Sequence, residues 1–286
     1  MAKQPKKPKT KKKKKAKKID RHYLYTAAVQ SVESDLAFFR RIYRKANGKP
    51  FRLLREDFCG TAVLAREWVG RKAENKAWGV DLDPATLEWG DKHYAEAMGD
   101  SRARLELMCN DVREVSRPQV EVIAALNFSY SVFKSRKDLV SYFRKVRHSL
   151  LPGGIFFLDA WGGTETMMEE TDKRRIDSEK AFDGTRTPSF TYFWEQSRFN
   201  PVNHHILCHI HFKLGNGKKI KRAFSYDWRL WMLPELHELM LEAGFRGTMV
   251  YGEGWDEEAD EADGKFRRRK RFDNEGAWVT YVVGLT

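Results

Sequence analysis

Residues 53–62, which read LLREDFCGTA, decide the fold of this chain. An apolar run enters a turn at Gly60, and residues 61–69 then continue with the apolar spacing of a helix. A strand, a tight turn and a helix in this order form the first unit of a parallel α/β sheet. In such sheets a ligand binds beyond the carboxyl ends of the strands, so this turn predicts a binding site.

Strands and helices alternate on both sides of this unit. Residues 23–44 have helical spacing, and Lys49-Pro50 ends that segment. Further strands are predicted at 77–80, 105–108, 120–126 and 155–159, with helices from Pro84 and over 138–150. This alternation is typical of a doubly wound, mostly parallel sheet.

The pattern changes at residues 190–231, where ten of 42 residues are aromatic. We expect three antiparallel strands here, with turns at Asn200-Pro201 and at 215–217. A helix at 233–243 and two strands, near 248–253 and 278–285, follow. Between these two strands, residues 255–272 carry six acids and then six bases, which predicts a solvated loop.

The net charge of +13 is concentrated at the N-terminus. Eleven lysines and Arg21 against Asp20 give residues 1–22 a charge of +11, which leaves +2 for the rest. We expect this segment to be a disordered tail. It could bind nucleic acid, act as a nuclear signal in a eukaryotic host, or only solubilise the protein.

Composition excludes several classes of protein. The longest apolar runs, such as 122–126, are too short to cross a membrane. Three cysteines without Cys-x-x-Cys spacing predict neither disulfides nor a zinc knuckle, and they favour the cytoplasm. His205, His209 and His211 would share one strand face but spread over about 20 Å, so no metal site is predicted.

The turn after the first strand suits a cofactor without phosphate. Phe58 and Ala62 stand where a dinucleotide-binding turn needs glycine, and only Gly60 allows close backbone approach. Asp81 follows Gly60 by 21 residues and ends the second strand, where a carboxylate can accept both ribose hydroxyls. Asp111 ends the third strand and could accept from an adenine amino group.

Five segments in this order resemble motifs of the class I S-adenosylmethionine-dependent methyltransferases. They are EDFCGTA at 56–62, GVDLDP at 79–84, CNDV at 109–112, LLPGGIFFLDA at 150–160 and LMLEAGF at 239–245. The resemblance implies a Rossmann-like sheet of seven strands. Its cofactor-binding domain would span 23–160 and 233–286, and residues 161–232 would be an inserted antiparallel cap on the substrate side.

The resemblance also implies S-adenosylmethionine as cofactor. The residues expected around it are Tyr25, Arg55, Glu56, Cys59, Gly60, Thr61, Ala62, Asp81, Leu82, Asn110, Asp111, Val112 and Asn127. Tyr25 would close over the cofactor. Arg55 would steer its carboxylate or simply lie on the surface. The motif acid aligns as Glu56 or Asp57, and counting back from Gly60 favours Glu56.

The acceptor is expected beyond the fourth and fifth strands. Asp159 is a candidate base or substrate anchor, with a loop-capping carboxylate as the alternative. Asn127 would accept from a planar amino group or line the methionine pocket. Tyr130, Trp161 and Trp194 are candidate substrate contacts.

The sequence therefore predicts a methyltransferase with a small-molecule acceptor. One alternative is an RNA- or ribosome-directed methyltransferase that uses the basic tail. The other is a non-catalytic nucleic-acid-binding protein on the same fold, because the turn lacks two glycines.

Overall fold

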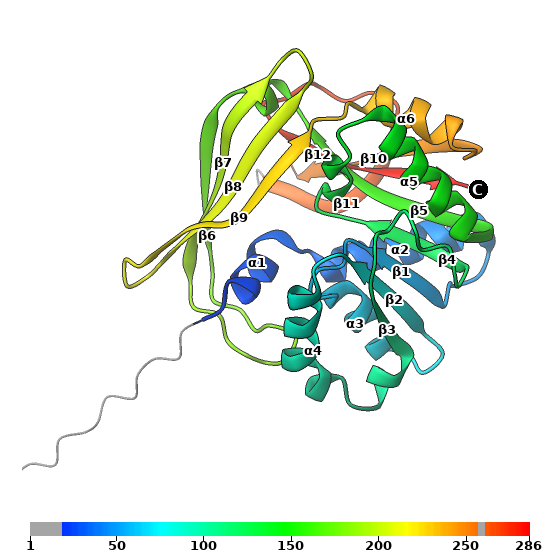
Figure 1. The fold of residues 1–286 in the computed structure, drawn as a ribbon, viewed down its shortest axis with the longest axis horizontal. Helices are drawn as coiled ribbons and strands as arrows, with labels where there is room; N and C mark the ends of the chain where they lie inside the picture. The colour runs from blue at the N-terminus through cyan, green and yellow to red at the C-terminus, as the bar shows by residue number, and fades with distance from the viewer. Residues whose placement is uncertain (1–18, 257–260) are drawn as a thin grey trace, which may run out of the picture.

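The computed structural model describes residues 19–256 and 261–286. Its main sheet has the strand order β11-β10-β12-β5-β4-β1-β2-β3, and β1 to β5 pair in parallel (Figure 1). The strands are β1 (Leu53–Asp57), β2 (Lys76–Asp81), β3 (Leu105–Cys109), β4 (Val120–Ala125), β5 (Leu150–Gly162), β10 (Gly247–Asp256), β11 (Glu261–Arg269) and β12 (Trp278–Leu285). The pairings of β12 with β5 and with β10 are antiparallel.

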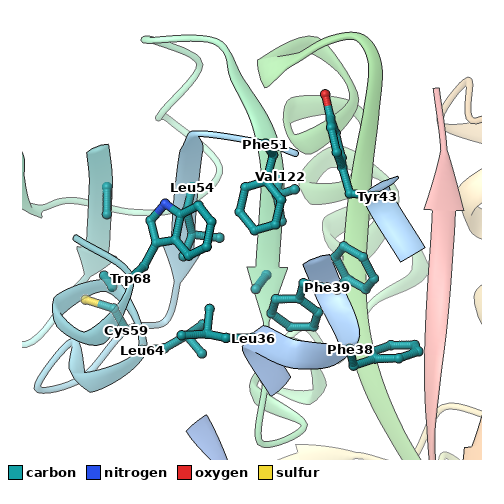
Figure 2. Packing of buried hydrophobic residues seen from close by; sticks show 14 of the residues in the cluster. Leu36, Phe38, Phe39, Tyr43, Phe51, Leu54, Cys59, Leu64, Trp68 and Val122 are labelled. Carbon is teal, nitrogen blue, oxygen red and sulfur yellow. The ribbon is translucent and has the colours of Figure 1, made fainter. Parts of the chain in front are cut away.

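Helices α2 to α6 cover both faces of this sheet, and α1 lies apart from it. The helices are α1 (Arg21–Val29), α2 (Val32–Asn47), α3 (Val63–Arg71), α4 (Pro84–Met98), α5 (Arg136–Ser149) and α6 (Leu233–Glu242). Apolar residues of α2 and α3 form one core cluster with the sheet, and those of α5 and α6 form another. In the first cluster, Phe51 stacks on Trp68 with ring centroids 4.2 Å apart (Figure 2).

A second sheet is inserted between β5 and α6. It consists of β6 (Glu170–Ile176), β7 (Phe190–Asn200), β8 (His205–Leu214) and β9 (Lys219–Arg229), all antiparallel. Helix α1 packs against it, since Leu24 and Ala28 share a cluster with Phe190 and Phe212. Figure 1 shows this sheet standing beside the main one, with α1 at its lower end. The inserted sheet thus has four strands where three were expected.

Two expectations about the N-terminus are wrong. The helix begins at Arg21, inside the segment expected to be disordered, because the Asp20 side chain accepts from the His22 N–H at 3.0 Å and caps it. The expected single helix over 23–44 is two helices, α1 and α2, broken at Gln30 and Ser31. Residues 1–18 lie outside the described part.

The charged stretch 255–272 is not simply a loop, because it contributes the eighth strand of the main sheet. β11 pairs with β10, and Phe266 packs on Phe38 and Tyr281 at centroid distances of 5.4 and 4.6 Å. Phe266 is the one large apolar side chain of this strand, and the pairing with β10 holds the strand together with it. Among the described residues, no helix has the length and apolar character that a bilayer crossing requires.

Candidate functional site

The turn after β1 contains three residues in the left-handed region. Phe58, Gly60 and Ala62 have φ angles of 56°, 54° and 58°. These are the three positions at which the methyltransferase motif has glycine. This conformation destabilises a non-glycine residue by about 1–2 kcal/mol. Packing holds both in place, because Ala62 is fully buried and the Phe58 ring lies 5.5 Å from that of Tyr142.

The turn therefore keeps the backbone path of a glycine-rich turn with a single glycine. A Cβ placed on Gly60 would meet only Thr86 Cγ2, at 3.9 Å, so the space over this residue is open. The side chains of Cys59 and Thr61 are buried. The turn thus offers a ligand the open space over Gly60 rather than these two side chains.

Asp81 joins the turn to the end of β2. Its Oδ2 accepts from the Gly60 N–H at 2.7 Å, and its Oδ1 accepts from the Asp83 N–H at 2.9 Å. The Cys59 N–H also donates to the Val80 carbonyl, at 2.9 Å. A carboxylate oxygen can accept more than one hydrogen bond, so Asp81 keeps capacity for two hydroxyl donors.

Helix α4 packs so closely on the turn that Gly90 has no room for a side chain. A Cβ at Gly90 would lie 2.7 Å from the Thr61 carbonyl oxygen. We expect Gly90→Ala to displace the turn and destabilise the protein by about 1–3 kcal/mol, as overpacking does. Gly70→Ala in α3 is the control, because nothing lies within 4 Å of its Cβ position. Alanine there should stabilise by up to about 1 kcal/mol. Equal melting temperatures for the two variants would contradict this packing.

Strand alternation places Glu56 and Asp57 on opposite faces of the sheet. Glu56 faces α3 and accepts from the Ala65 N–H at 2.9 Å. Asp57 faces α5, where the Arg55 guanidinium donates to both of its oxygens at 2.7 and 3.0 Å and the Tyr142 hydroxyl donates at 2.9 Å. Asp57 is thus fully engaged, and the geometry favours Glu56 as the motif acid.

The surface alternative for Arg55 is wrong, because its side chain is completely buried. Asp57 holds the guanidinium, and a role in steering the cofactor carboxylate stays a prediction. Residues two apart on a strand share a face, so Arg55 and Asp57 pair with each other beneath α5.

Burial raises the pKa of Glu56 to about 8, with the Ala65 hydrogen bond and Arg66 opposing and the charges of Asp81 and Asp35 adding to the rise. The ordinary value is 4.5. Protonation of Glu56 thus favours the folded state, and its contribution is complete below pH 4.5 and lost as the pH rises through 8.

We therefore expect the free energy of unfolding to fall between pH 5 and 8. Glu56 contributes up to about 1.4 kcal/mol per pH unit to the slope of the free energy of unfolding against pH. Glu56→Gln keeps an acceptor for Ala65 and should flatten the profile, whereas Glu96→Gln on the exposed face of α4 should not. Urea unfolding across this range measures the slope, and identical slopes for all three proteins would refute the assignment.

The residues expected to contact the adenine follow the ends of β2 and β3. The Arg113 guanidinium contacts both oxygens of Asp111, the nearer at 2.7 Å, and this pairing lowers the pKa of Asp111. Asn110 accepts from the Asp111 N–H, and Val112 is buried. Leu82 is 67% exposed, which leaves a large apolar side chain free to cover a ring. Contact of these residues with an adenine stays a prediction.

A cavity of about 670 Å³ lies where β4, β5 and β12 end against the second sheet and α1. Five of the expected site residues line it: Tyr25, Asn127, Asp159, Trp161 and Trp194. Burial raises the pKa of Tyr25. The expectation for Tyr130 is wrong, because this side chain is 1% exposed and packs in the α5 and α6 cluster.

Asp159 caps the loop that follows β4. Its Oδ2 accepts from the Asn127 N–H at 2.6 Å and its Oδ1 from the Phe128 N–H at 2.9 Å. Both donors have a φ of 58°, so the carboxylate holds a strained turn. Burial raises its pKa to about 7, and the two amide hydrogen bonds oppose that rise. The loop-capping alternative for Asp159 is therefore correct, and the residue also lines the cavity.

Comparison with known proteins finds solved structures that are similar to this chain. No family model and no curated protein matches the chain. An S-adenosylmethionine-bound amino pentose methyltransferase from Micromonospora echinaspora matches with a TM-score of 0.63 at 14% identity, over 93% of this chain and 96% of that one. The sugar N-methyltransferase KedS8 from Streptoalloteichus matches with a TM-score of 0.62 at 15% identity, over 99% and 98%.

A third solved structure, an S-adenosylmethionine-dependent methyltransferase from Clostridium acetobutylicum, matches with a TM-score of 0.60 at 16% identity, over 92% and 97%. This chain has the methyltransferase fold. The fold predicted from the motif order is confirmed, with one strand more than expected in the main sheet and one more in the inserted sheet.

Asp35 and Tyr281 are among the cavity residues that the sequence reasoning missed. The Tyr281 hydroxyl donates to Asp35 Oδ1, and burial raises the pKa of Asp35 to about 6. Tyr281 lies directly across from Asp159 in the β5–β12 pairing. One signal was available, since Asp35 stands at helical spacing with Phe38 and Ile42 on the apolar face of α2.

Two of the three histidines of β8 have side-chain partners on neighbouring strands. His209 Nδ1 lies 2.7 Å from the Ser225 hydroxyl, and His211 Nε2 lies 2.6 Å from Glu195. Within residues 19–256 and 261–286, no three His, Cys, Asp or Glu side chains are grouped as metal ligands would be.

Proposed function

We propose that this protein transfers a methyl group from S-adenosylmethionine to a small-molecule acceptor. One observation carries the proposal. The cavity of about 670 Å³ begins at the carboxyl ends of β4 and β5, and residues of α1 and of the inserted sheet line its other sides. Ligands of open α/β sheets bind at this edge, and this volume suits a small molecule.

The residues around the turn fit this cofactor. A cationic amino group is the natural partner for the buried carboxyl of Glu56, and the open space over Gly60 admits a chain without phosphate. Asp81 would accept from the ribose hydroxyls. Leu82 and Val112 would contact the adenine, and Tyr25 would close over the site.

The cofactor supplies an activated methyl on a sulfonium. The protein has to align the acceptor with it and exclude water. Asp159 is fixed by two amide donors, so it can anchor an acceptor or take a proton without moving. The aromatic rings of Trp161 and Trp194, with centroids 5.9 Å apart, shield the acceptor from solvent.

The proposal also covers the domain organisation of the chain and the cellular compartment of the protein. We assign residues 23–160 and 233–286 to the cofactor-binding domain and 161–232 to a substrate cap. Among the similar structures, the amino pentose and sugar N-methyltransferases support a small acceptor by analogy. The three free cysteines fit the cytoplasm.

Calorimetry with S-adenosylmethionine tests the first half of the proposal, and transfer of a labelled methyl to pooled small molecules tests the second. We expect binding in the micromolar range and label in the small-molecule fraction. The absence of binding at millimolar cofactor would overturn the proposal and favour a non-catalytic protein. Label found only on RNA would favour the RNA-directed alternative.

A further inference from the structure

The cavity walls carry more acids than bases. Asp35 and Asp159 are buried at its floor. On β6, Glu170 and Asp172 also line the cavity, and Asp172 lies directly across from Trp194 in the pairing with β7. Side chains in direct register share a face of a sheet, so these two carboxylates are on the side of the Trp194 ring.

The nearest bases do not neutralise these acids. Arg174 also lines the cavity, but its guanidinium donates to the Ala28 carbonyl of α1 and lies 4.9 Å from the centroid of the Tyr192 ring. Lys173 lines the cavity as well, although its side chain alternates with that of Asp172 along β6. The lining residues include six acids against these two bases, so acids outnumber bases around the cavity.

Aromatic rings form the wall opposite the floor. Trp194 lies 6.1 Å from both Tyr226 and Trp228, and those two rings stack at 4.3 Å. All three line the cavity. Aromatic faces together with carboxylates are the surroundings that bind an organic cation.

One polar atom in the cavity wall has no partner. The Trp161 Nε1–H is buried and makes no hydrogen bond, and the residue as a whole is only 7% exposed. Buried donors are nearly always satisfied, so this one indicates a missing acceptor atom. Trp161 is one of the residues that line the cavity, so an oxygen of a bound ligand is a candidate acceptor for this N–H.

We infer that the acceptor is a small amine, bound as its cation between the carboxylates and the aromatic wall, with a hydroxyl or ether oxygen that accepts from Trp161. This inference rests on the proposed function. In the reaction the ammonium would lose one proton through a cavity carboxylate to water, the N–C bond would form as the S–C bond to the methyl breaks, and S-adenosylhomocysteine would leave.

Four ring compounds of similar size test the inference on the full chain by ligand-observed NMR. They are trans-2-aminocyclohexanol, cyclohexylamine, trans-1,2-cyclohexanediol and trans-2-hydroxycyclohexanecarboxylate. We expect the amino alcohol to bind best, with the amine and the diol each about tenfold weaker and the carboxylate weakest. Equal or tighter binding of the diol or the carboxylate would overturn the inference.

Two variants separate the two contacts. Trp161→Phe keeps the ring and loses the N–H, so the amino alcohol should lose its advantage over cyclohexylamine. Asp172→Asn should weaken both amines about threefold and leave the diol unchanged. Glu169→Gln, exposed and outside the cavity, is the matched control. No effect of the first two variants on these rankings would overturn the inference.

Cofactor calorimetry on the same sample keeps the two proposals apart. If S-adenosylmethionine does not bind, the proposed function fails. If it binds and neither amine does, the amine inference alone fails.

Discussion

Asp81→Ala is expected to weaken S-adenosylmethionine binding by about 10- to 150-fold, the range for loss of charge-assisted hydrogen bonds. The carboxylate would accept from the ribose, and it also accepts from the Gly60 and Asp83 N–H groups. Alanine therefore removes a ligand contact and releases the turn at Gly60. Both effects lower affinity, and calorimetry measures their sum.

Asp83→Ala is the matched control for this prediction. Asp83 caps α4, where it accepts from the Ala85 N–H at 2.9 Å and the Thr86 hydroxyl at 2.7 Å. Its loss should cost about 1 kcal/mol of stability and leave affinity nearly unchanged. If Asp81→Ala and Asp83→Ala bind the cofactor equally well, the ribose lies elsewhere.

Arg55→Ala is expected to destabilise the protein by about 3–5 kcal/mol, because it strands the buried carboxylate of Asp57. Neither partner is exposed, so solvent cannot replace the guanidinium. Urea unfolding measures the loss. The double variant Arg55→Met with Asp57→Leu should recover much of it, because no uncompensated charge remains.

The single variant Arg55→Ala also decides between two roles for Arg55. A purely structural pair predicts an unchanged cofactor Kd in the fraction of Arg55→Ala that is folded. A clear rise in Kd with normal stability would instead restore the steering role that the sequence suggested.

The parallel strands β1 to β4 could be predicted because each is short, contains an apolar run and is followed by turn residues. The arrangement of the cavity could not, because its walls come from elements far apart in sequence. Tyr25 on α1, Asp159 on β5 and Trp194 on β7 meet only through the packing of α1 on the inserted sheet. No local pattern encodes that contact.

Two misassignments had signals in the sequence. Arg55 and Asp57 are two residues apart on a strand, so their pairing follows from alternation. Phe266 is a single aromatic within a run of charges, and it alone marks the inner face of β11. Tyr130 differs, because a short 3-10 helix at Ser129–Val132 buries it, and the sequence pattern had not marked that turn.

The left-handed residues at 58, 60 and 62 bear on how such proteins are recognised. Two of these three residues have side chains, and the packing of Phe58 and Ala62 holds the torsion angles that glycine would adopt freely. The turn is defined by a sequence of backbone torsion angles, which residues other than glycine also adopt when packing holds them. A motif that requires glycine at all three positions passes over this turn, whereas a motif defined by torsion angles finds it.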